Sequence, residues 1–396
     1  MYSQAFSPQN LYSCTTQSER RNSGLSKEDL VQNVSLCIGD TINNGTFQFK
    51  IRTLDDIYLN DCPKNTMEYL CQDIVLRKLY CNIKRIYGVE QANRNQIVKQ
   101  MKSLLQEETP KWVVRLDVRH FYESIIRSKL IDRFQDDGRL NYQSIGLLKN
   151  IFQHPIVAPT SGLPRGLSIS SVMSELYMKY FDLEVRRIEG VFYYARFVDD
   201  IIVFCSSKNA QDTVWKKVPD LLWKLGLSLN EAKSYKWDSE DTQSILTYLG
   251  YSFVQKSAKR VAISMAERKM NTIKSRITKS FVRFSKDGNF GLLKARIKFL
   301  TGNFTLYNHS TLLPINVGIY YNYNMLTDKK ALYEMDKYYQ CLLHCRGGRL
   351  GVKLAARMTE VQRKELAKFS FVFGFENRVH HYFTPAILAD ITNCWR

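Results

Sequence analysis

The amino-acid sequence predicts an α+β fold, in which an antiparallel sheet is surrounded by helices and followed by a mostly helical region. Short β-rich runs at residues 112–118, 191–197 and 201–205 alternate with longer segments whose apolar residues recur every three or four positions. A short acidic turn separates the last two runs, which is typical of a hairpin. From residue 265 onward, helical and very basic segments dominate.

The N-terminal part of the chain is predicted to be mostly helical after a polar start. Residues 1–24 are interpreted as a flexible N-terminal arm. Residues 26–29 have the spacing of a capping box, which predicts the start of a helix. Alternating apolar and polar residues indicate a short strand at 47–51. Helical periodicity then covers residues 63–88 and 95–106.

The middle of the chain contains the predicted sheet and the helices between its strands. The apolar run 112–118 predicts a buried strand, and residues 125–152 are expected to be mostly helical. Residues 161–166 predict a loop that leads into another helix. A helix at 210–225 and a strand at 246–253 complete this block.

The charge of the chain indicates a polyanionic partner. Lysine and arginine number 57 against 38 aspartate and glutamate residues, so the formal net charge is +19. Nucleic acid is the commoner partner for such an excess, because basic side chains neutralise its phosphates. A generally basic surface is the alternative that charge alone leaves open. No apolar run approaches the ~18 residues needed to cross a bilayer, so we expect no membrane partner.

The nine cysteines predict reduced thiols. Their number is odd and no CxxC pair occurs, which argues against a zinc ribbon. Cys341 and Cys345 have helical i,i+4 spacing, which buried thiols explain more often than metal ligands do. The polar N-terminus lacks the apolar segment of a signal peptide. We therefore expect a cytoplasmic protein.

Carboxylates stand at the ends of the predicted strands. Asp117 follows an apolar strand, and Asp199 and Asp200 form the acidic turn of the hairpin. An unpaired charge in a buried strand costs several kcal/mol, and a divalent cation would remove that cost. Phosphoryl transfer uses two such cations, roughly 3.5–4 Å apart. Taken alone, however, the Asp-Asp pair is also typical of a simple turn.

The candidate metal ligands are Asp117, Asp199 and Asp200, together with the main-chain carbonyl of Val118. Mg²⁺ prefers a few carboxylates plus water and phosphate oxygens, so two Mg²⁺ ions are expected, with Mn²⁺ as an alternative. One ion would activate an attacking hydroxyl, and the other would stabilise a pyrophosphate leaving group.

Five segments resemble the motifs of reverse transcriptases, in the order that this family has them. Residues 116–122 resemble the first palm motif, and residues 161–170 resemble the Gly-x-Pro-Gln-Gly motif that supports the template and the incoming nucleotide. Residues 197–200 (Phe-Val-Asp-Asp) resemble the aromatic-x-Asp-Asp box. Residues 226–233 resemble the next motif, which ends in a lysine, and residues 248–253 resemble the primer-grip hairpin.

The resemblance implies an RNA-directed DNA polymerase with a right-hand fold of fingers, antiparallel-sheet palm and helical thumb. It would use an RNA template and dNTPs and release cDNA. We expect four parts: a flexible arm at 1–24, N-terminal helices and fingers at 25–110, palm with the remaining fingers at 111–256, and a basic helical thumb and C-terminal region at 257–396.

The resemblance also assigns roles to single residues. Asp117, Asp199 and Asp200 would be catalytic. The expected nucleotide-binding residues are Tyr122, Lys84, Arg85, Arg94, Arg165 and Lys233. Tyr122 stands where the family keeps an aromatic gate that rejects a 2′-hydroxyl. Without the motif, a core aromatic would be preferred for Tyr122, and surface positions remain the alternative for the basic residues.

Two positions depart from the family pattern. Arg165 stands where the family usually has Gln, and Val198 where Ala or Met is usual. The Arg165 departure leaves template handling in doubt.

The aromatics of the predicted thumb are Phe299, Phe304, Tyr307, Tyr320, Tyr321 and Tyr323. They would stack on bases or primer, although packing in the core is the alternative for most of them.

Two further segments narrow the resemblance. Residues 93–105, leading to 121–124, and residues 296–303 resemble bacterial defence-associated reverse transcriptases, which are related to retron and group II intron enzymes. The "a" subunit of the type three, two-polymerase system is the member that these segments suggest first. This resemblance implies antiphage defence, a noncoding RNA as template or scaffold, and a second reverse transcriptase as partner.

Two other functions compete with templated synthesis. The same palm would also support template-independent or protein-primed DNA synthesis, at which Arg165 hints. A non-catalytic RNA-binding subunit is the alternative from another class. The intact Asp117, Asp199, Asp200 and Tyr122 argue against it, because an inactive palm has no physical reason to keep them.

Overall fold

The structure is a computed structural model that describes residues 2–241, 244–257, 260–307 and 314–395. The described residues fall into two compact units. The first contains residues 2–93 and 111–238, and the second contains residues 94–110, 239–307 and 314–395. One limit coincides with the predicted boundary at 110/111, whereas the change of unit after residue 238 comes before the predicted boundary at 256/257.

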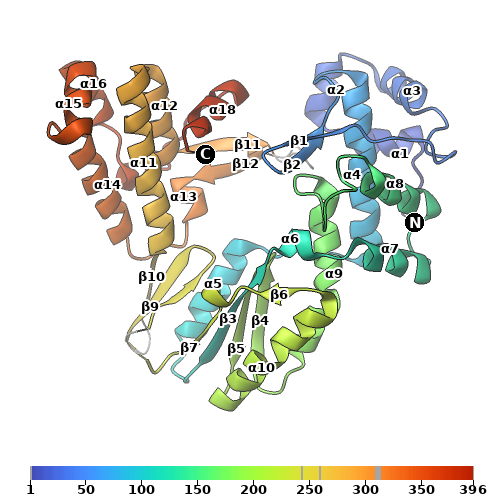
Figure 1. Cartoon of the computed structure of the whole chain (residues 1–396), viewed down its shortest axis with the longest axis horizontal. Coiled ribbons are helices and arrows are strands. Elements are labelled where there is room, and N and C mark those ends of the chain that lie inside the picture. The colour runs from blue at the N-terminus through green and yellow to red at the C-terminus, as the bar shows by residue number, and fades with distance from the viewer. Residues whose placement is uncertain (1, 242–243, 258–259, 308–313, 396) are drawn as a thin grey trace. The chain divides into compact units, whose positions relative to one another are not determined.

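Most helices and strands of both units are labelled in Figure 1. The first unit contains α1 (Pro8–Ser13), α2 (Gln17–Ser23), α3 (Lys27–Ile38), β1 (Ile51–Leu54), β2 (Ile57–Asn60), α4 (Met67–Tyr87), β3 (Trp112–Arg119), α6 (Phe121–Ser124), α7 (Arg127–Asp136), α8 (Tyr142–Gln153), α9 (Ser168–Arg186), β4 (Val191–Phe197), β5 (Asp200–Cys205), α10 (Lys208–Leu225), β6 (Ser228–Leu229), the 3-10 helix η1 (Glu231–Lys233) and β7 (Tyr235–Asp238). The second contains α5 (Arg94–Leu105), β8 (Leu246–Tyr248), β9 (Tyr251–Ser257), β10 (Arg260–Met265), α11 (Glu267–Asp287), α12 (Phe290–Thr301), β11 (Asn303–Tyr307), β12 (Pro314–Gly318), α13 (Ile319–Asn322), α14 (Lys330–Leu343), α15 (Gly348–Arg357), α16 (Glu360–Leu366), α17 (Phe371–Glu376) and α18 (Pro385–Asn393).

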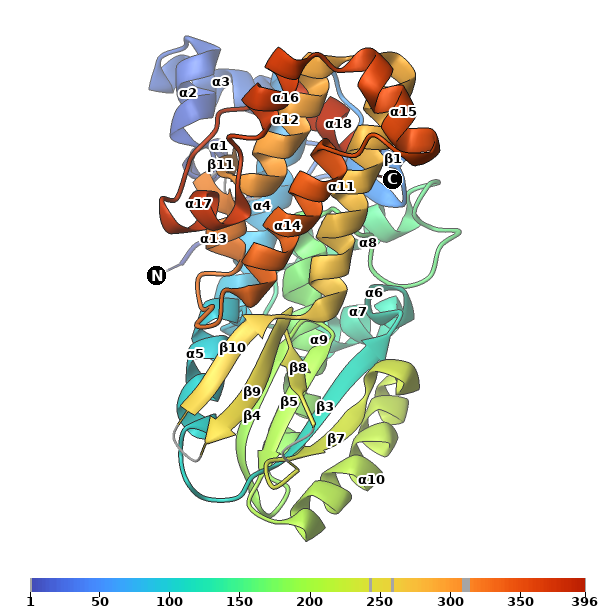
Figure 2. The same ribbon diagram turned by 90° about the vertical axis from the view of Figure 1, so that its left-hand side faces the viewer.

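A five-stranded antiparallel sheet is the centre of the first unit. Its strand order is β4-β5-β3-β6, and β7 also pairs with β3. Figure 2 shows β4, β5, β3 and β7 as neighbouring strands, and α9 and α10 pack against this sheet. Four residues of β5 in succession, from Ile201 to Phe204, are fully buried, which explains why this run is apolar without alternation. The predicted α+β fold with an antiparallel sheet is confirmed.

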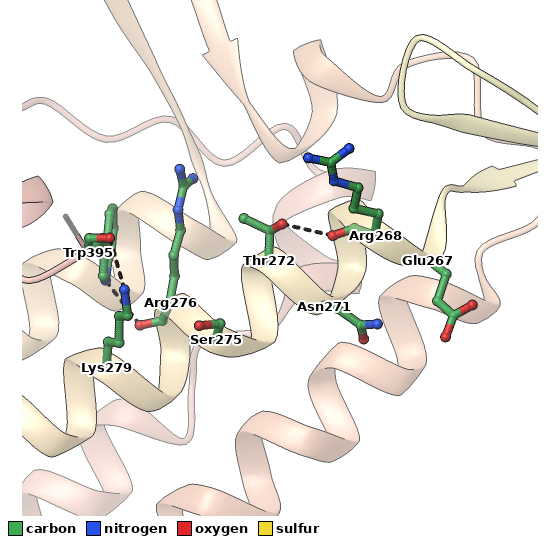
Figure 3. Close-up of a pocket in the computed structure, with 8 residues that line it drawn as sticks. All are labelled: Glu267, Arg268, Asn271, Thr272, Ser275, Arg276, Lys279 and Trp395. Atoms are coloured by element: carbon green, nitrogen blue, oxygen red, sulfur yellow. Dashed lines mark hydrogen bonds between the residues drawn. The ribbon is translucent and has the colours of Figure 1, made fainter. Parts of the chain in front are cut away.

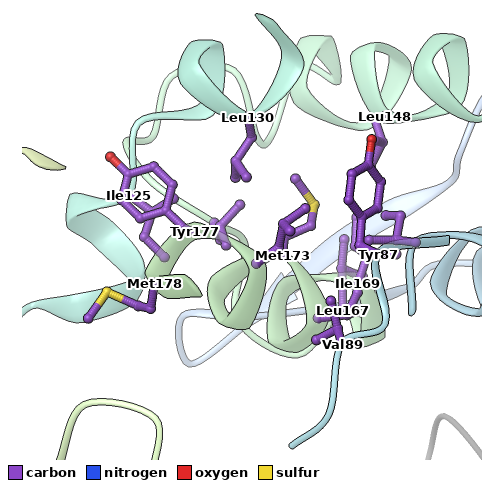
Figure 4. Close-up of a cluster of buried hydrophobic side chains, with 14 of the residues drawn as sticks. Tyr87, Val89, Ile125, Leu130, Leu148, Leu167, Ile169, Met173, Tyr177 and Met178 are labelled. Carbon is purple, nitrogen blue, oxygen red and sulfur yellow. The ribbon is translucent and has the colours of Figure 1, made fainter. Parts of the chain in front are cut away.

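The hydrophobic core of this unit lies around α9. Ile169, Met173 and Tyr177 recur at helical spacing and are buried. Figure 4 shows these side chains among residues of other helices, such as Leu130 of α7 and Leu148 of α8. Fully burying one such apolar side chain stabilises the fold by roughly 1.5–3 kcal/mol. The N-terminus of α9 is thereby held firmly beside the sheet.

The first residues of the chain form two helices where the sequence indicated a flexible arm. Thr16 caps α2 in a capping box with Glu19. The Glu19 carboxylate also reaches Arg77 of α4, with 2.5 Å between Oε1 and Nη2, and the Arg77 side chain is only 6% exposed. The difference arises because a buried arginine on α4 needs a partner, and the arm supplies it.

The strand predicted at 47–51 begins only at its last residue. β1 starts at Ile51 and pairs with β2, whereas Phe47 and Phe49 lie before it with buried rings 5.1 Å apart. Side chains from α4 and α8 bind the backbone here: Gln72 donates to the carbonyl of Gln48, and the amide of Phe49 donates to Asn150. These contacts replace the hydrogen bonds of a strand partner.

The second unit combines a three-stranded sheet with helices. Strands β10, β9 and β8 pair in that order, and the single strand predicted at 246–253 is a hairpin of β8 and β9. The hairpin of β11 and β12 was not predicted. In the parts of the chain that the structure describes, no helix is both long and apolar enough to cross a membrane.

Segment 94–110, which the sequence placed with the fingers, belongs to this second unit. Its helix α5 packs against β10. Arg94 donates to the carbonyl of Leu249 from Nη2 at 2.6 Å and to the carbonyl of Asn322 from Nη1 at 2.6 Å. Its guanidinium also lies 4.8 Å from the ring centre of Tyr251. These contacts explain why α5 belongs to the second unit, although it follows α4 of the first unit in the sequence.

Candidate active site

Strand pairing brings the three predicted aspartates to one end of the sheet. Asp117 of β3 lies opposite Asp200 of β5 in the antiparallel register. Asp199 occupies the turn between β4 and β5, where its carbonyl accepts a hydrogen bond from the amide of Val118 at 3.0 Å. Both predicted metal-binding strands therefore end at the same place.

The segment after β6 fixes the position of Asp117. The amide of Asn230 donates to the main-chain carbonyl of Asp117 at 2.8 Å. The amide of Asp117 donates to the hydroxyl of Ser234 at 3.1 Å. Lys233 places its ammonium 3.1 and 3.2 Å from the two carboxylate oxygens. The lysine of the predicted nucleotide-binding set therefore lies directly against a predicted catalytic carboxylate.

The other two carboxylates share a crowded environment. Burial raises the pKa of Asp199 above its ordinary value, and the negative charges of Asp200 and Asp117 raise it further. Burial likewise raises the pKa of Asp200, although the Arg115 guanidinium, 3.2 Å away, opposes this effect. Close, partly buried carboxylates repel one another, so this end of the sheet has a deficit of positive charge.

The turn that carries Asp199 has a strained backbone, and contacts with Arg196 hold it in place. Val198 has a φ of +60°, which is unfavourable for a β-branched residue. Arg196 donates to the carbonyl of Val198 at 3.1 Å and also binds the carboxylates of Glu175 and Asp182 on α9. Backbone strain of this kind persists where surrounding contacts enforce it, which is common at functional sites.

The second unit has a pocket of about 670 Å³, and the first unit has one of about 490 Å³ that is lined in part by Asp199. The smaller pocket is lined by Phe121, Tyr122, Arg165, Gly166, Leu167, Ser168, Ser170, Ser171 and Asp199. It lies at the N-terminus of α9, where main-chain amides favour an anion. Among the described residues, the buried hydroxyl oxygen of Ser168 has no hydrogen-bond partner.

Tyr122 is held on the wall of this pocket by the loop before α9. Its carbonyl accepts a hydrogen bond from the amide of Leu163 at 2.7 Å. Gly162 has a φ of +69°, and a Cβ there would lie 2.1 Å from the same carbonyl, so only glycine fits. Burial raises the pKa of the Tyr122 hydroxyl above its ordinary value. The ring is therefore a neutral, fixed surface facing the pocket that contains Asp199.

Arg165 is paired within the chain. Its guanidinium lies 2.6 Å from the carboxylate of Glu123, and both side chains are about half exposed. It also lies 5.8 Å from the ring centre of Tyr122. The extra charge at this position, compared with the usual glutamine, is thus balanced by a neighbouring acid.

The structure does not bring every predicted residue to the pocket. Lys84 and Arg85 are exposed at the end of α4, where Arg85 lies 4.8 Å from the ring centre of Tyr2. They are not among the residues that line the pocket, and Arg94 belongs to the other unit.

Sequence reasoning missed several residues that line the pocket or pair with residues of the site. They are Arg115, Glu123, Ser168, Glu175 and Asp182. Arg115 had a signal, because it stands two residues before Asp117 and therefore on the same face of β3. The others become neighbours only through the packing of α9 and the loop before it.

The donor set fits a hard divalent cation. Carboxylates are the ligands that Mg²⁺ prefers, and Asp117 and Asp199 are the residues that would hold it, with Asp200 beside them. In the chain as described, no group of three or more His, Cys, Asp or Glu side chains is arranged to ligate a metal. Lys233 and Arg115 instead supply the positive charge, through their ion pairs with Asp117 and Asp200.

The pocket of the second unit is a basic groove along α11, which Figure 3 shows. Arg268, Thr272 and Arg276 project from the same side of the helix, at i, i+4 and i+8 spacing. The indole of Trp395 donates to the carbonyl of Arg276 at 3.0 Å, and Lys279 donates to the carbonyl of Trp395 at 3.1 Å. These contacts hold the end of the chain on the groove.

Most predicted thumb aromatics pack against other rings of this unit. Phe299 lies 4.4 Å from Phe304, and Tyr323 lies 5.8 Å from Tyr251, measured between ring centres. Tyr320 and Tyr321 lie 5.3 Å apart. The side chain of Tyr307 is outside the described part of the structure.

Clustered carboxylates at the end of an antiparallel sheet, beside an anion-favouring pocket, are features that two-metal nucleotidyl transfer requires. The sequence profile of the family "Reverse transcriptase (RNA-dependent DNA polymerase)" matches residues 56–253, which is half of the chain. The chain therefore belongs to the reverse transcriptase family. This membership agrees with the resemblance of its five motifs to those of reverse transcriptases.

The chain is also similar to solved telomerase structures. It shares 14% identity with apo telomerase from Candida tropicalis truncated from the C-terminal domain, with a TM-score of 0.36 and coverage of 48% of this chain and 44% of that chain. With telomerase from Candida albicans in complex with a TWJ fragment of telomeric RNA, it shares 12% identity, with a TM-score of 0.37 and coverage of 81% and 53%. The chain spans about half the length of these telomerase chains. No curated protein matches its sequence.

Proposed function

We propose that this chain copies a noncoding RNA template into DNA by adding dNTPs at the site that contains Asp117, Asp199 and Asp200. One observation carries the proposal. Tyr122, Asp199 and the N-terminus of α9 line a single pocket, which therefore offers a surface for a sugar and an environment for a triphosphate. The register of β3 and β5 puts the remaining two aspartates next to it.

Each residue of the site has a proposed role. Asp117 and Asp199 would hold two divalent ions, which would supply activation of the attacking hydroxyl and stabilisation of the pyrophosphate. Lys233 leaves Asp117 to contact the triphosphate or to protonate pyrophosphate. The unpartnered hydroxyl of Ser168 and the amides of α9 bind phosphate oxygens. Tyr122 packs under the sugar and excludes a 2′-hydroxyl.

Replacing Tyr122 with alanine is expected to relax the selection between dNTPs and NTPs. The ratio of their kcat/KM values should fall by roughly 10- to 100-fold, because the ring no longer excludes a hydroxyl. Single-nucleotide extension with dNTP and with NTP measures this ratio. Tyr122→Phe is the matched control and should keep the wild-type ratio, since it retains the ring. An unchanged ratio in Tyr122→Ala would show that the ring does not face the sugar.

The groove along α11 is proposed to bind the template–product duplex through phosphate contacts. Raising the salt from ~50 to ~200 mM should weaken binding of an RNA–DNA hybrid by about two orders of magnitude, because bound cations are released from the phosphates. Fluorescence anisotropy with a labelled hybrid measures this. The double variant Arg268→Ala/Arg276→Ala should lower the salt slope by about two. A flat salt response of the wild type would contradict a phosphate-binding groove.

The biological setting is proposed to be antiphage defence in a bacterial cytoplasm. The formal net charge of +19 suits an RNA that the protein holds as a scaffold as well as a template. Residues 93–105 and 296–303, which resemble the defence-associated enzymes, support this assignment. A second reverse transcriptase subunit is the proposed protein partner.

Sequencing of copurified nucleic acid tests the proposal against its competitors. The chain is isolated from its host, incubated with Mg²⁺ and labelled dNTPs, and both RNA and DNA are sequenced. A defined RNA with a complementary labelled DNA is the expected result. Labelled DNA without a complement in any bound RNA would favour template-independent or protein-primed synthesis. Bound RNA without any labelled DNA would favour a non-catalytic RNA-binding subunit.

A further inference from the structure

Among the described residues, one cation, Arg165, lies on the wall of the pocket that contains Asp199. Asp199 is the single carboxylate of that described wall, and the other side chains that line it are aromatic, aliphatic or hydroxyl groups. A triphosphate is strongly anionic, so its approach to a carboxylate depends on positive charge nearby. Arg165 is therefore the charged donor that the wall itself offers to a triphosphate.

The guanidinium of Arg165 is already bound to a carboxylate that lies outside the pocket. Its Nε lies 2.6 Å from Oε1 of Glu123, and its Nη2 donates to Oε2 at 3.0 Å. Two parallel hydrogen bonds of this kind are the geometry in which a guanidinium binds either a carboxylate or a phosphate group. Glu123 belongs to α6 and is not among the residues that line the pocket. An internal anion thus uses the edge of Arg165 that also suits a phosphate.

Contacts fix the backbone around Arg165, whereas its side chain is open to solvent. The carbonyl of Arg165 accepts a hydrogen bond from the amide of Tyr58 at 2.7 Å. A Cβ at Gly166 would lie 2.7 Å from the carbonyl oxygen of Tyr58, so this loop and β2 are in close contact. The side chain of Arg165 is 52% exposed, and that of Glu123 is 40% exposed. A change of partner therefore requires only the rotation of exposed side chains.

The ion pair of Arg165 with Glu123 is weak enough to be exchanged for a stronger one. Water and salt screen two exposed groups, so a pair of this kind contributes little to stability. A triphosphate carries several negative charges and more acceptor oxygens than one carboxylate does. In the same pocket it also meets the hydroxyl groups and main-chain amides at the N-terminus of α9. A triphosphate in this pocket is therefore a stronger ligand for the guanidinium than Glu123 is.

We propose that Glu123 competes for Arg165, and that the triphosphate of an incoming nucleotide replaces Glu123 on the guanidinium. This exchange rests on the proposed function, because its ligand is the nucleotide that binds beside Asp199. Arg165 contacts phosphate oxygens, and Glu123 is a positioning residue that acts through Arg165. The ion pair therefore lowers the affinity of the pocket for nucleotides and leaves the chemical step unchanged. The glutamine that is usual at position 165 carries no charge for a neighbouring acid to hold.

Equilibrium binding of a dNTP tests the exchange without catalysis. The full-length chain is bound to an RNA template whose DNA primer has a dideoxy end, so the next dNTP binds but is not incorporated. Isothermal titration calorimetry measures the Kd of that dNTP. Glu123→Gln should lower this Kd by about two- to fivefold, because the amide keeps the shape of the side chain and loses its charge. Arg165→Gln should raise the Kd by at least about tenfold, because a charged hydrogen bond to phosphate is lost.

The double variant Glu123→Gln/Arg165→Gln separates the exchange from a general change of charge. Loss of the Glu123 charge should lower the Kd in the wild-type chain but not in Arg165→Gln, because salt screens an exposed charge outside the pocket. An equal decrease in both backgrounds, or a higher Kd in Glu123→Gln, would overturn the proposal. Glu184→Gln is the matched control and should keep the wild-type Kd, since this acid also forms an exposed ion pair but does not line the pocket. Circular dichroism verifies that each variant is folded.

Two further measurements separate this exchange from a template contact and from the proposed function. Fluorescence anisotropy gives the Kd of the template–primer, which should be the same in Glu123→Gln and the wild type. A change confined to that Kd would place Arg165 on a template phosphate and overturn the proposal. Extension of an ordinary primer tests the proposed function. The expected pattern of dNTP binding without any DNA synthesis would contradict the proposed function alone, whereas DNA synthesis with an unchanged dNTP Kd in Glu123→Gln would contradict only the role of Glu123.

Discussion

Replacing Asp199 with asparagine is expected to reduce DNA synthesis by at least about 10³-fold, which corresponds to roughly 4 kcal/mol of transition-state stabilisation. Asp199 is the carboxylate that lines the nucleotide pocket, and an amide is neutral and a weaker ligand for a divalent ion. Single-turnover extension of a DNA primer on an RNA template measures the chemical step.

The fold should survive this substitution, which separates lost chemistry from unfolding. Burial raises the pKa of Asp199, so its charged form opposes folding at neutral pH. A neutral asparagine should therefore leave the melting temperature unchanged or slightly higher, and RNA binding should persist. Asp212→Asn on α10 is the control, because this exposed carboxylate pairs with Lys236 and is not among the residues that line the pocket. Full activity in Asp199→Asn would refute the assignment.

Replacing Arg196 with methionine is expected to destabilise the first unit by about 3–5 kcal/mol. The Arg196 side chain is only 4% exposed and lies 2.7 Å from Glu175 and 2.8 Å from Asp182. Burial alone lowers the pKa of Arg196, but the hydrogen bonds and charge of these acids raise it well above its ordinary value, so it is charged at every pH of interest. Its loss leaves two poorly hydrated carboxylates without their cation. Urea unfolding followed by circular dichroism measures the change.

Two further variants test this explanation. Adding Glu175→Gln and Asp182→Asn to Arg196→Met should recover most of the lost stability, because no uncompensated charge remains. Arg187→Met is the control. Its ion pair with Glu184 is exposed, so its loss should change stability by less than about 0.5 kcal/mol. A loss below about 1 kcal/mol in Arg196→Met would contradict a structural role for the buried triad.

The Arg196→Met variant should also affect the candidate active site. Arg196 binds the carbonyl of Val198, whose positive φ shapes the turn that carries Asp199. The buried triad therefore connects the stability of α9 and the hairpin with the placement of a catalytic carboxylate. Strain at Val198 is a local feature that the usual alanine or methionine of the family would relieve in part, since neither is β-branched.

Sequence patterns predicted the helices and strands correctly where these depend on residues close together in the chain. The apolar runs around Asp117 and Asp199 predicted both strands, and the antiparallel register follows from the short turn between β4 and β5. The capping signal at Ser26 marked the start of α3. A second signal, Thr16 followed by Glu19, has capping-box spacing and would have predicted α2 in the supposed arm.

Long-range contacts explain what the sequence did not predict. The ion pair of Lys233 with Asp117 joins residues that are far apart in the chain, so no local sequence pattern predicts it. Arg94 was assigned to the fingers from its position before the palm, but the carbonyls of Leu249 and Asn322 bind its guanidinium in the second unit. Phe47 and Phe49 alternate like a strand, yet Gln72 of α4 and Asn150 of α8 bind the backbone of Gln48 and Phe49.

A template-exchange experiment tests most directly whether the chain is directed by RNA. The purified chain receives Mg²⁺, all four dNTPs and one of two RNA templates of unrelated sequence, each with a complementary DNA primer, and the products are sequenced. We predict that each product is the complement of the RNA supplied and that the Asp199→Asn variant makes neither. The same DNA sequence from both templates, or synthesis that persists in Asp199→Asn, would contradict RNA-directed synthesis at this site.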